Sequence, residues 1–237
     1  MPNHTIQRSA TAEEQAFLQA LLSKATTKMG RWRQGLENAL VLWAVSLLGC
    51  VIVWLICAGL TRWLFSVDYG FRSPAAPWIL GIATPLCGAY AAFSSVRWVR
   101  RWKDMRPSLN ADLVAAQVVE EHYVFNAAKR FQEPEHGGLI YFLRTPDDRA
   151  LTLYDPESQD LGVQDEDPLT SSFKPMSRLV MVRAPETGFV ISMTFSGDPL
   201  DAGEPIELTL PPEQWPETEQ YCDIPWPELE TVLGPRA

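Results

Sequence analysis

The chain has 237 residues, enough for one or two domains, and its mean hydropathy of -0.08 is typical of a soluble protein. The charge is uneven, because residues 1–106 hold 12 Lys and Arg against 5 Asp and Glu, whereas residues 107–237 hold 8 against 24. A second half with a net charge of -16 repels polyanions, which argues against nucleic acid as a partner.

Residues 1–37 are expected to form a cytoplasmic N-terminal segment with one amphipathic helix. In "TAEEQAFLQALLSKATT", Thr11 and Glu14 have the spacing of a capping box, in which two side chains bond to backbone amides at a helix start. One helical face collects the apolar residues Phe17, Leu18, Leu21, Leu22 and Ala25. This helix could lie on the membrane or on the cytoplasmic domain, or it could be an ordinary N-terminal helix with no lipid role.

Two uncharged runs of 24 residues, 38–61 and 73–96, predict a pair of transmembrane helices. A helix needs about 20 apolar residues to cross the hydrocarbon core of a bilayer, and the first run lies too far from Met1 for a signal peptide. The external connector at 62–72 is short, so an antiparallel hairpin is expected. Neither run contains an ionisable side chain of Asp, Glu, Lys, Arg or His, which argues against a channel or pump.

Positive charge predicts the orientation of this hairpin. Residues 1–37 carry five Lys and Arg, the basic juxtamembrane segment 97–107 carries five more, and the connector carries two. The positive-inside rule then places both termini in the cytoplasm. Arginine and tryptophan suit the headgroup layer, so the residues expected at the membrane interface are Trp32, Arg97, Trp98, Arg100, Arg101 and Trp102. The segment is interpreted as an anchor that fixes orientation, with specific lipid recognition as the alternative.

Residues 108–237 predict an acidic, β-rich cytoplasmic domain, because short β-rich runs alternate there with turn residues. The run 138–145 is apolar on both faces, so it is expected at the centre of a sheet. A short helix is expected over Pro225–Leu233. The predicted fold is therefore an α+β membrane protein whose cytoplasmic domain is a small all-β barrel or sandwich. The expected strands are 118–131, 138–145, 150–155, 177–184, 189–195 and 204–210.

The run "EPEHGG", Glu133 to Gly138, places two carboxylates beside a histidine. Carboxylate and neutral imidazole are suitable metal ligands, so the candidate ligands are Glu133, Glu135, His136 and, from the preceding strand, His122. The favoured interpretation is a turn between two strands, since proline ends a ladder and glycine permits positive φ.

The sequence contains no motif for a catalytic centre or a cofactor. Walker, GxGxxG, HExxH and kinase signatures are missing, and the four cysteines include no CxxC pair. The acidic residues between Asp155 and Asp167 lack EF-hand spacing and are interpreted as a solvated loop. The proline-rich tail with Trp215 and Trp226 is expected to wrap the domain and bury its aromatic rings, although it could also bind a partner.

Three segments, "AAKRFQEPEHGGLIYFLRTPDD", "LTLYDPESQD" and "EDPLTSSF", resemble segments of bacterial membrane proteins of unknown function. In that family a two-helix hairpin precedes a β-rich cytoplasmic domain. The resemblance covers most of the chain after Thr11 and implies a location in the bacterial inner membrane. The family has no established activity, so the resemblance implies no functional residues.

Three functions remain open from the sequence. In the first, the hairpin holds the acidic domain at the lipid bilayer, where it binds a protein partner with a basic surface, forms a homo-oligomer or helps assemble an envelope complex. In the second, a metal-dependent enzyme or regulator uses the loop that contains Glu133, Glu135 and His136. In the third, the chain is an accessory subunit of a transporter.

Overall fold

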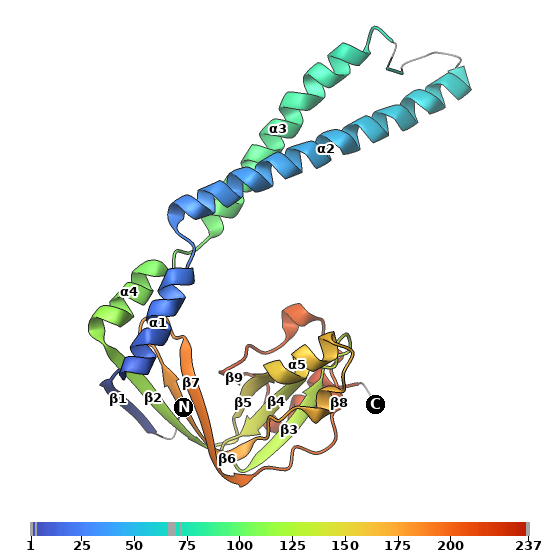
Figure 1. Ribbon diagram of the computed structural model, residues 1–237. Coiled ribbons are helices and arrows are strands. Elements are labelled where there is room, and N and C mark those ends of the chain that lie inside the picture. The colour runs from blue at the N-terminus through green and yellow to red at the C-terminus, as the bar shows by residue number, and fades with distance from the viewer. Residues whose placement is uncertain (1, 3, 66–69, 72, 236–237) are drawn as a thin grey trace. The chain divides into compact units, whose positions relative to one another are not determined.

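The computed structural model describes residues 2, 4–65, 70–71 and 73–235, and its secondary structure is α+β (Figure 1). The chain divides into two compact units. Residues 21–107 form a helical unit, whereas residues 1–20 and 108–237 together form a β-rich domain. The connector predicted at 62–72 lies partly outside the described residues.

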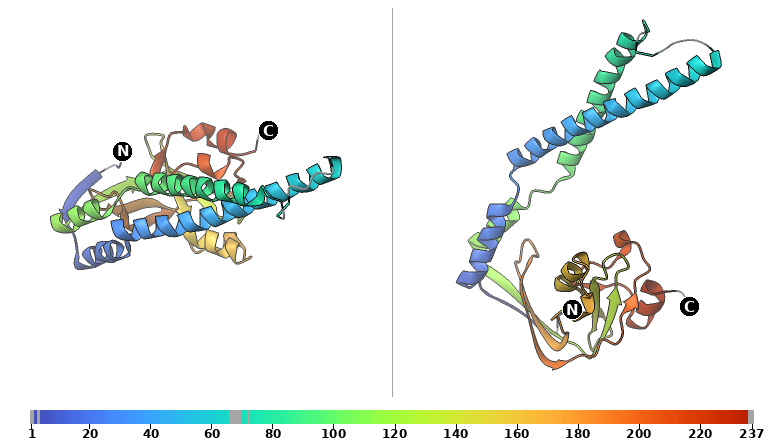
Figure 2. Two further views of the ribbon diagram at one scale, coloured as in Figure 1. Left: turned by 90° about the horizontal axis from the view of Figure 1, so that it is seen from above. Right: turned by 45° about the vertical axis from the view of Figure 1, so that its right-hand side comes forward.

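The helical unit consists mainly of α2 (Lys28–Phe65) and α3 (Ala76–Arg101), which lie next to each other in the views of Figures 1 and 2. Trp43 Nε1 donates to the backbone oxygen of Thr84 across the pair at 3.1 Å. Both helices are long and apolar enough to cross a membrane, as the two uncharged runs predicted.

The first sheet of the domain is antiparallel and has the order β1-β2-β6-β7. Its outer strand β1 was missed by the sequence analysis, which predicted only a helix in residues 1–37. The helix α1 (Ala12–Lys24) follows β1, and α4 (Arg106–Ala115) leads into β2. The strands are β1 (His4–Ser9), β2 (Gln117–Val124), β6 (Met176–Arg183) and β7 (Val190–Pro199).

The second sheet has the order β8-β3-β4-β5-β9, and β4 lies at its centre as predicted. Side chains on both faces of β4 are buried, because Tyr141 and Leu143 join one hydrophobic cluster and Phe142 joins the other. The strands are β3 (Ala127–Gln132), β4 (Leu139–Arg144), β5 (Ala150–Asp155), β8 (Ile206–Glu207) and β9 (Gln220–Cys222).

Two hydrophobic clusters hold the domain together. The first draws side chains from both sheets, including Met181 of β6 and Leu153 of β5. The second covers the other face of the β3-β4-β5 sheet, where Trp215 and Trp226 pack with residues of the C-terminal helix α6 (Leu229–Leu233). The tail therefore wraps the domain, as expected. Two short 3-10 helices, η2 (Pro212–Gln214) and η3 (Trp226–Glu228), shape this tail.

The predicted domain was a barrel or a sandwich. The described strands form two open sheets with a shared core, and no closed barrel is present in that part of the chain. Three other details of the predicted domain were wrong. The run 118–131 is two strands in different sheets, and only two residues of 204–210 pair as a strand. The acidic segment from Asp155 to Asp167 contains the helix α5 (Pro156–Val163), and the short η1 (Pro168–Thr170) follows it.

Candidate functional site

The "EPEHGG" run forms a tight turn between β3 and β4, as the favoured interpretation predicted. The backbone N–H of Glu133 donates to Gly138 O at 2.9 Å, and that of Gly137 donates to Glu133 O at 3.1 Å. Glu133 Oε1 accepts the backbone N–H of His136 at 3.0 Å, and Gly137 has a φ of +73°. Glu135 and His136 are exposed. Glycine is favoured at this left-handed position because a Cβ is disfavoured there.

The helix α5 supports this turn from one side. Asp155 caps α5, since its Oδ1 accepts the backbone N–H groups of Glu157 and Ser158 at 3.1 and 3.3 Å. Ser158 Oγ in turn accepts the N–H of Leu139 at 2.7 Å, which ties α5 to the start of β4. The signal for α5 lies in "DPES", where a capping aspartate precedes a proline at the first helical position.

The predicted metal ligands do not come together. His122 lies on β2, in the first sheet, and its Nε2 contacts Glu120 Oε1 at 2.8 Å. Glu133, Glu135 and His136 follow β3, in the second sheet. Among the residues that the structure describes, no three His, Cys, Asp or Glu side chains are placed to share a metal ion.

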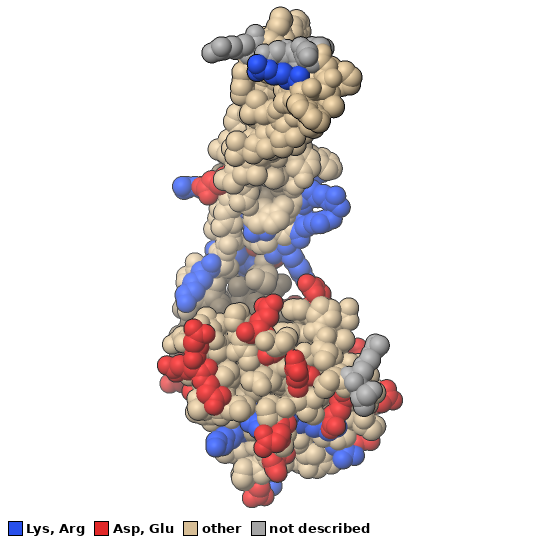
Figure 3. All heavy atoms as spheres, turned by 90° about the vertical axis from the view of Figure 1, so that its right-hand side faces the viewer, with Lys and Arg blue, Asp and Glu red and all other residues tan. Residues whose placement is uncertain are grey.

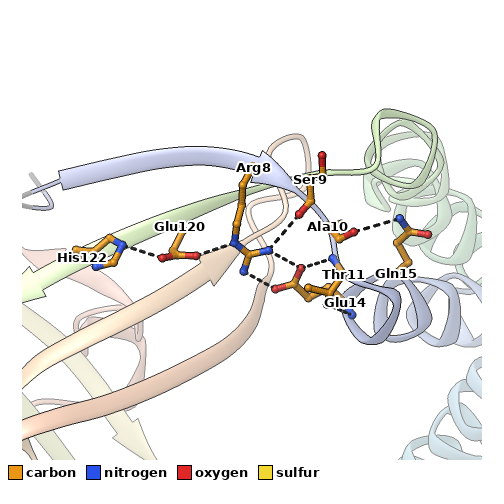
Figure 4. Close-up of polar contacts among 8 residues, drawn as sticks. All are labelled: Arg8, Ser9, Ala10, Thr11, Glu14, Gln15, Glu120 and His122. Carbon is orange, nitrogen blue, oxygen red and sulfur yellow. Dashed lines mark hydrogen bonds and ion pairs between the residues drawn. The ribbon is translucent and has the colours of Figure 1, made fainter.

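An ion-pair network that is centred on Arg8 and ends at His122 ties the N-terminal strand to its neighbours (Figure 4). The guanidinium of Arg8 binds Glu120 through Nε at 2.7 Å and Glu14 through Nη1 and Nη2 at 2.9 and 2.7 Å. These hydrogen bonds hold the pKa of both carboxyl groups below its ordinary value. The predicted capping box is present, because Glu14 Oε2 accepts the Thr11 N–H at 2.8 Å while Thr11 Oγ1 accepts that of Glu14 at 3.3 Å.

Two cavities meet at Trp215, beside the turn. One, of about 90 Å³, is lined by Glu133, Tyr154, Asp155 and Trp215 among others. The second, of about 290 Å³, lies against Glu133, Glu135 and Pro211 and shares the tryptophan. We call the two together the Trp215 groove. Trp215 Nε1 donates a hydrogen bond to the backbone oxygen of Leu210 at 2.7 Å, so the indole is held in place.

The Trp215 groove contains an unsatisfied acidic group. Asp155 is 2% exposed, and its Oδ2 atom is buried without a hydrogen-bond partner. A carboxylate oxygen in such surroundings favours a cationic donor, since ionised hydrogen bonds are the strong ones where water is excluded. With Glu133 beside it and an indole ring in the wall, the groove has the chemistry of a site for an ammonium or guanidinium group.

The expected interface residues lie in the helical unit. Trp32 and Trp98 are 45% and 37% exposed, and the arginines at 97, 100 and 101 are exposed as well. The sequence analysis missed Arg31, whose guanidinium carbon stands 3.2 Å from the ring centre of Trp98 and 5.8 Å from that of Trp102. The sequence gave no sign of these cation–π contacts, because Trp98 lies in α3 and Trp102 directly follows it, far from Arg31 in the sequence.

Comparison of the chain with protein-family models, with curated proteins and with solved structures finds no match.

Proposed function

We propose that the chain is an integral protein of the bacterial inner membrane, with both termini in the cytoplasm, whose acidic domain binds a basic segment of a protein partner. The two long helices support the anchor. Their outer surfaces expose large apolar side chains that water solvates poorly, and burial of each in lipid is worth about 1.5–3 kcal/mol. Examples that are 49% to 66% exposed are Val45, Leu48, Ile52, Val53, Ile56, Ile82, Leu86 and Phe93.

The charge of the domain supports a basic partner. Asp and Glu side chains are spread over the face of the domain in Figure 3, in keeping with the net charge of -16 in residues 107–237. Such a surface accelerates the association of a positively charged partner and repels acidic ones. Diffuse attraction of this kind raises the association rate and makes binding depend on salt concentration. Specificity needs a defined pocket.

The buried, unpartnered Oδ2 of Asp155 is the observation that carries the proposal. A lysine or arginine side chain in the Trp215 groove would supply the missing donor, neutralise Glu133 and stack its alkyl stem on the indole. The bound segment would therefore be anchored by one buried cation, and its other basic residues would contribute through the surrounding field.

Binding of a fluorescent Lys-Gly repeat octapeptide to the full-length protein in nanodiscs tests this function. Asp155→Asn keeps the helix cap but removes the charge, and Glu133→Gln removes the second carboxylate. Each is expected to raise the Kd about tenfold, which corresponds to about 1.4 kcal/mol. Glu166→Gln removes an equal charge from an exposed acid outside the groove and should leave the Kd within about twofold.

Two results would contradict the proposal. Equal weakening by all three substitutions would show that only the overall charge attracts the peptide. Surface attraction is strongest at low salt, so a failure of the peptide to bind the unaltered protein under that condition would rule out a basic partner.

A further inference from the structure

A second cavity, of about 190 Å³, has the opposite chemistry from the Trp215 groove. It is lined by Arg130 of β3, Tyr141 of β4, residues that follow η1 and the loop that joins β7 to β8. Its polar lining consists of Arg130, Tyr141, Ser171, Lys174, Asp201 and the backbone of Gly203. Because two bases and one acid meet here, the cavity is locally positive within an acidic domain.

The guanidinium of Arg130 is only partly satisfied. Nη2 donates to the backbone oxygen of Gly203 at 2.7 Å, which holds the side chain at the cavity. Nε is buried and has no hydrogen-bond partner. A buried N–H without an acceptor is unfavourable, so a ligand that brings an anionic oxygen would gain a strong, charge-assisted bond.

The other bases of the domain distinguish this cavity further. Ion pairs with carboxylates engage Lys129, Arg144, Arg149 and Arg183. In the described part of the domain, Arg130, Lys174 and Arg178 form no such pair, although acids outnumber bases threefold in residues 107–237, and only Arg130 and Lys174 of these three line the cavity. The nearby Asp201 is itself exposed and accepts the N–H of Gly203 at 2.9 Å. Two bases without carboxylate partners thus share one cavity.

Aromatic rings form the inner part of the cavity. Tyr141, which is 3% exposed, lies with its ring centre 4.9 Å from that of Phe173, and Phe173 lies 5.3 Å from Phe195. Burial raises the pKa of Tyr141 and outweighs the opposite effect of the neighbouring Arg130 guanidinium, which hydrogen-bonds to the hydroxyl. The hydroxyl is therefore protonated near neutral pH and lies beside Arg130. The lining therefore suits a ligand that combines an anionic group with a flat apolar part.

We propose that this cavity binds a small phosphate monoester, with the phosphate between Arg130 and Lys174 and an apolar part against Tyr141 and Phe173. Arginine matches phosphate oxygens with its planar fork, and lysine adds a point charge. The volume is below that of most drug-sized pockets, so a compact ligand or a head group fits better than a large one. The inference is independent of the basic partner, because the Trp215 groove contributes no residue to this cavity.

Calorimetric titration of the full-length protein in zwitterionic nanodiscs with phenyl phosphate tests the site. We expect saturable, one-to-one binding that is tighter than that of inorganic phosphate or phenol. Arg130→Gln and Lys174→Gln should each weaken it about tenfold, as expected for loss of a charge-assisted bond. Arg178→Gln removes an equal charge from an exposed base outside the cavity and should have little effect.

Absence of saturable phenyl phosphate binding, or equal weakening by the Arg178 control, overturns the proposal. Lys174 is exposed, so its variant keeps the test valid even if Arg130→Gln fails to fold. Nanodiscs that contain anionic lipid identify the source of the phosphate. Competition with phenyl phosphate supports the site with a lipid head group as its ligand, and unchanged binding supports it with a free phosphate monoester.

Discussion

Arg8 and Glu120 form an ion pair with 2.7 Å between Nε and Oε2, although 112 positions separate them in the sequence. The same guanidinium binds Glu14 at the start of α1. One arginine therefore fastens the N-terminal strand and the first helix to β2.

Replacement of Arg8 by Gln should lower the free energy of unfolding of the domain by about 1–2 kcal/mol, because two partly buried carboxylates lose a charged donor. Urea unfolding followed by near-UV circular dichroism measures the change. Arg33→Gln serves as the control, since Arg33 pairs with Glu37 in an exposed i,i+4 contact that is worth a few tenths of a kcal/mol. Equal effects of the two substitutions would show that the network adds nothing.

Acid should weaken the same network. The hydrogen bonds from Arg8 hold the pKa of Glu14 and of Glu120 below the ordinary value of 4.5. Their contribution to stability is therefore complete above about pH 4.5 and is lost as the pH falls through the lower, folded-state values. Urea midpoints recorded from pH 7 down to pH 3.5 should fall more steeply for the natural protein than for Arg8→Gln. Parallel curves for the natural protein and Arg8→Gln would show that the Arg8 hydrogen bonds do not cause the loss of stability in acid.

Gly162→Ala should disturb the support of the turn. A Cβ at this position would lie 1.6 Å from the backbone oxygen of His136, so either α5 or the turn must move. We expect a loss of about 1–3 kcal/mol and faster hydrogen exchange at Gly137. Gly138→Ala is the matched control, because its added Cβ would meet Gln159 and Glu133 at 3.4 Å, an ordinary contact. A tolerated Gly162→Ala would show that the turn does not depend on α5.

Asp112→Ala should loosen the hairpin of β6 and β7. The carboxylate of Asp112 is fully buried and accepts the N–H groups of Glu186 and Thr187 at 2.7 and 3.1 Å, and the Thr187 hydroxyl at 2.7 Å. Its loss leaves these donors unpaired, for which we expect about 2–4 kcal/mol. Hydrogen exchange at the two amides measures the effect. In Asp112→Asn the remaining amide oxygen should keep part of the protection from exchange at the Glu186 and Thr187 amides. Equal exchange in Asp112→Asn and Asp112→Ala would show that these hydrogen bonds do not hold the hairpin.

The proposed topology makes a direct prediction. Alkaline phosphatase, which is active only outside the cytoplasm, should be silent when fused after Ala237, and green fluorescent protein at the same position should fluoresce. The reason is the excess of Lys and Arg on both sides of the apolar pair. Phosphatase activity with a dark fluorescent fusion would reverse the orientation.

Much of the central sheet could be predicted from local pattern. The run that contains Tyr141, Phe142 and Leu143 is apolar on consecutive positions, which happens when both faces of a strand are covered. The turn at Gly137 was equally visible, because proline and glycine act locally. The apolar runs gave the two long helices by length alone.

Features set by distant pairing could not be predicted in this way. β1 carries only one apolar side chain, Ile6, and its partner β2 is more than 100 residues away. The break between β2 and β3 has no proline or glycine. It arises because Phe125 N donates to Ser177 O while Asn126 N donates to Arg144 O, in different sheets. Tertiary hydrogen bonds outweigh strand propensity at such a point.

The same limit applies to the sites. The histidine of "EPEHGG" drew attention to metal chemistry, whereas the groove beside it depends on Asp155 and Trp215, which are 60 positions apart. Neither residue belongs to a motif with Glu133. Arg130 likewise gave no signal, because its free Nε becomes significant only once the fold has placed its neighbours.

The pairing of β1 with β2 makes the domain discontinuous in sequence. The helical pair is, in folding terms, a long insertion between the first strand and the second, so β1 must wait for residues 117–124 to leave the ribosome before it can pair. Until then, β1 has no strand to pair with, and its backbone N–H and C=O groups stay exposed. A tag or deletion at residues 4–9 would therefore alter maturation of a domain encoded more than 100 codons downstream.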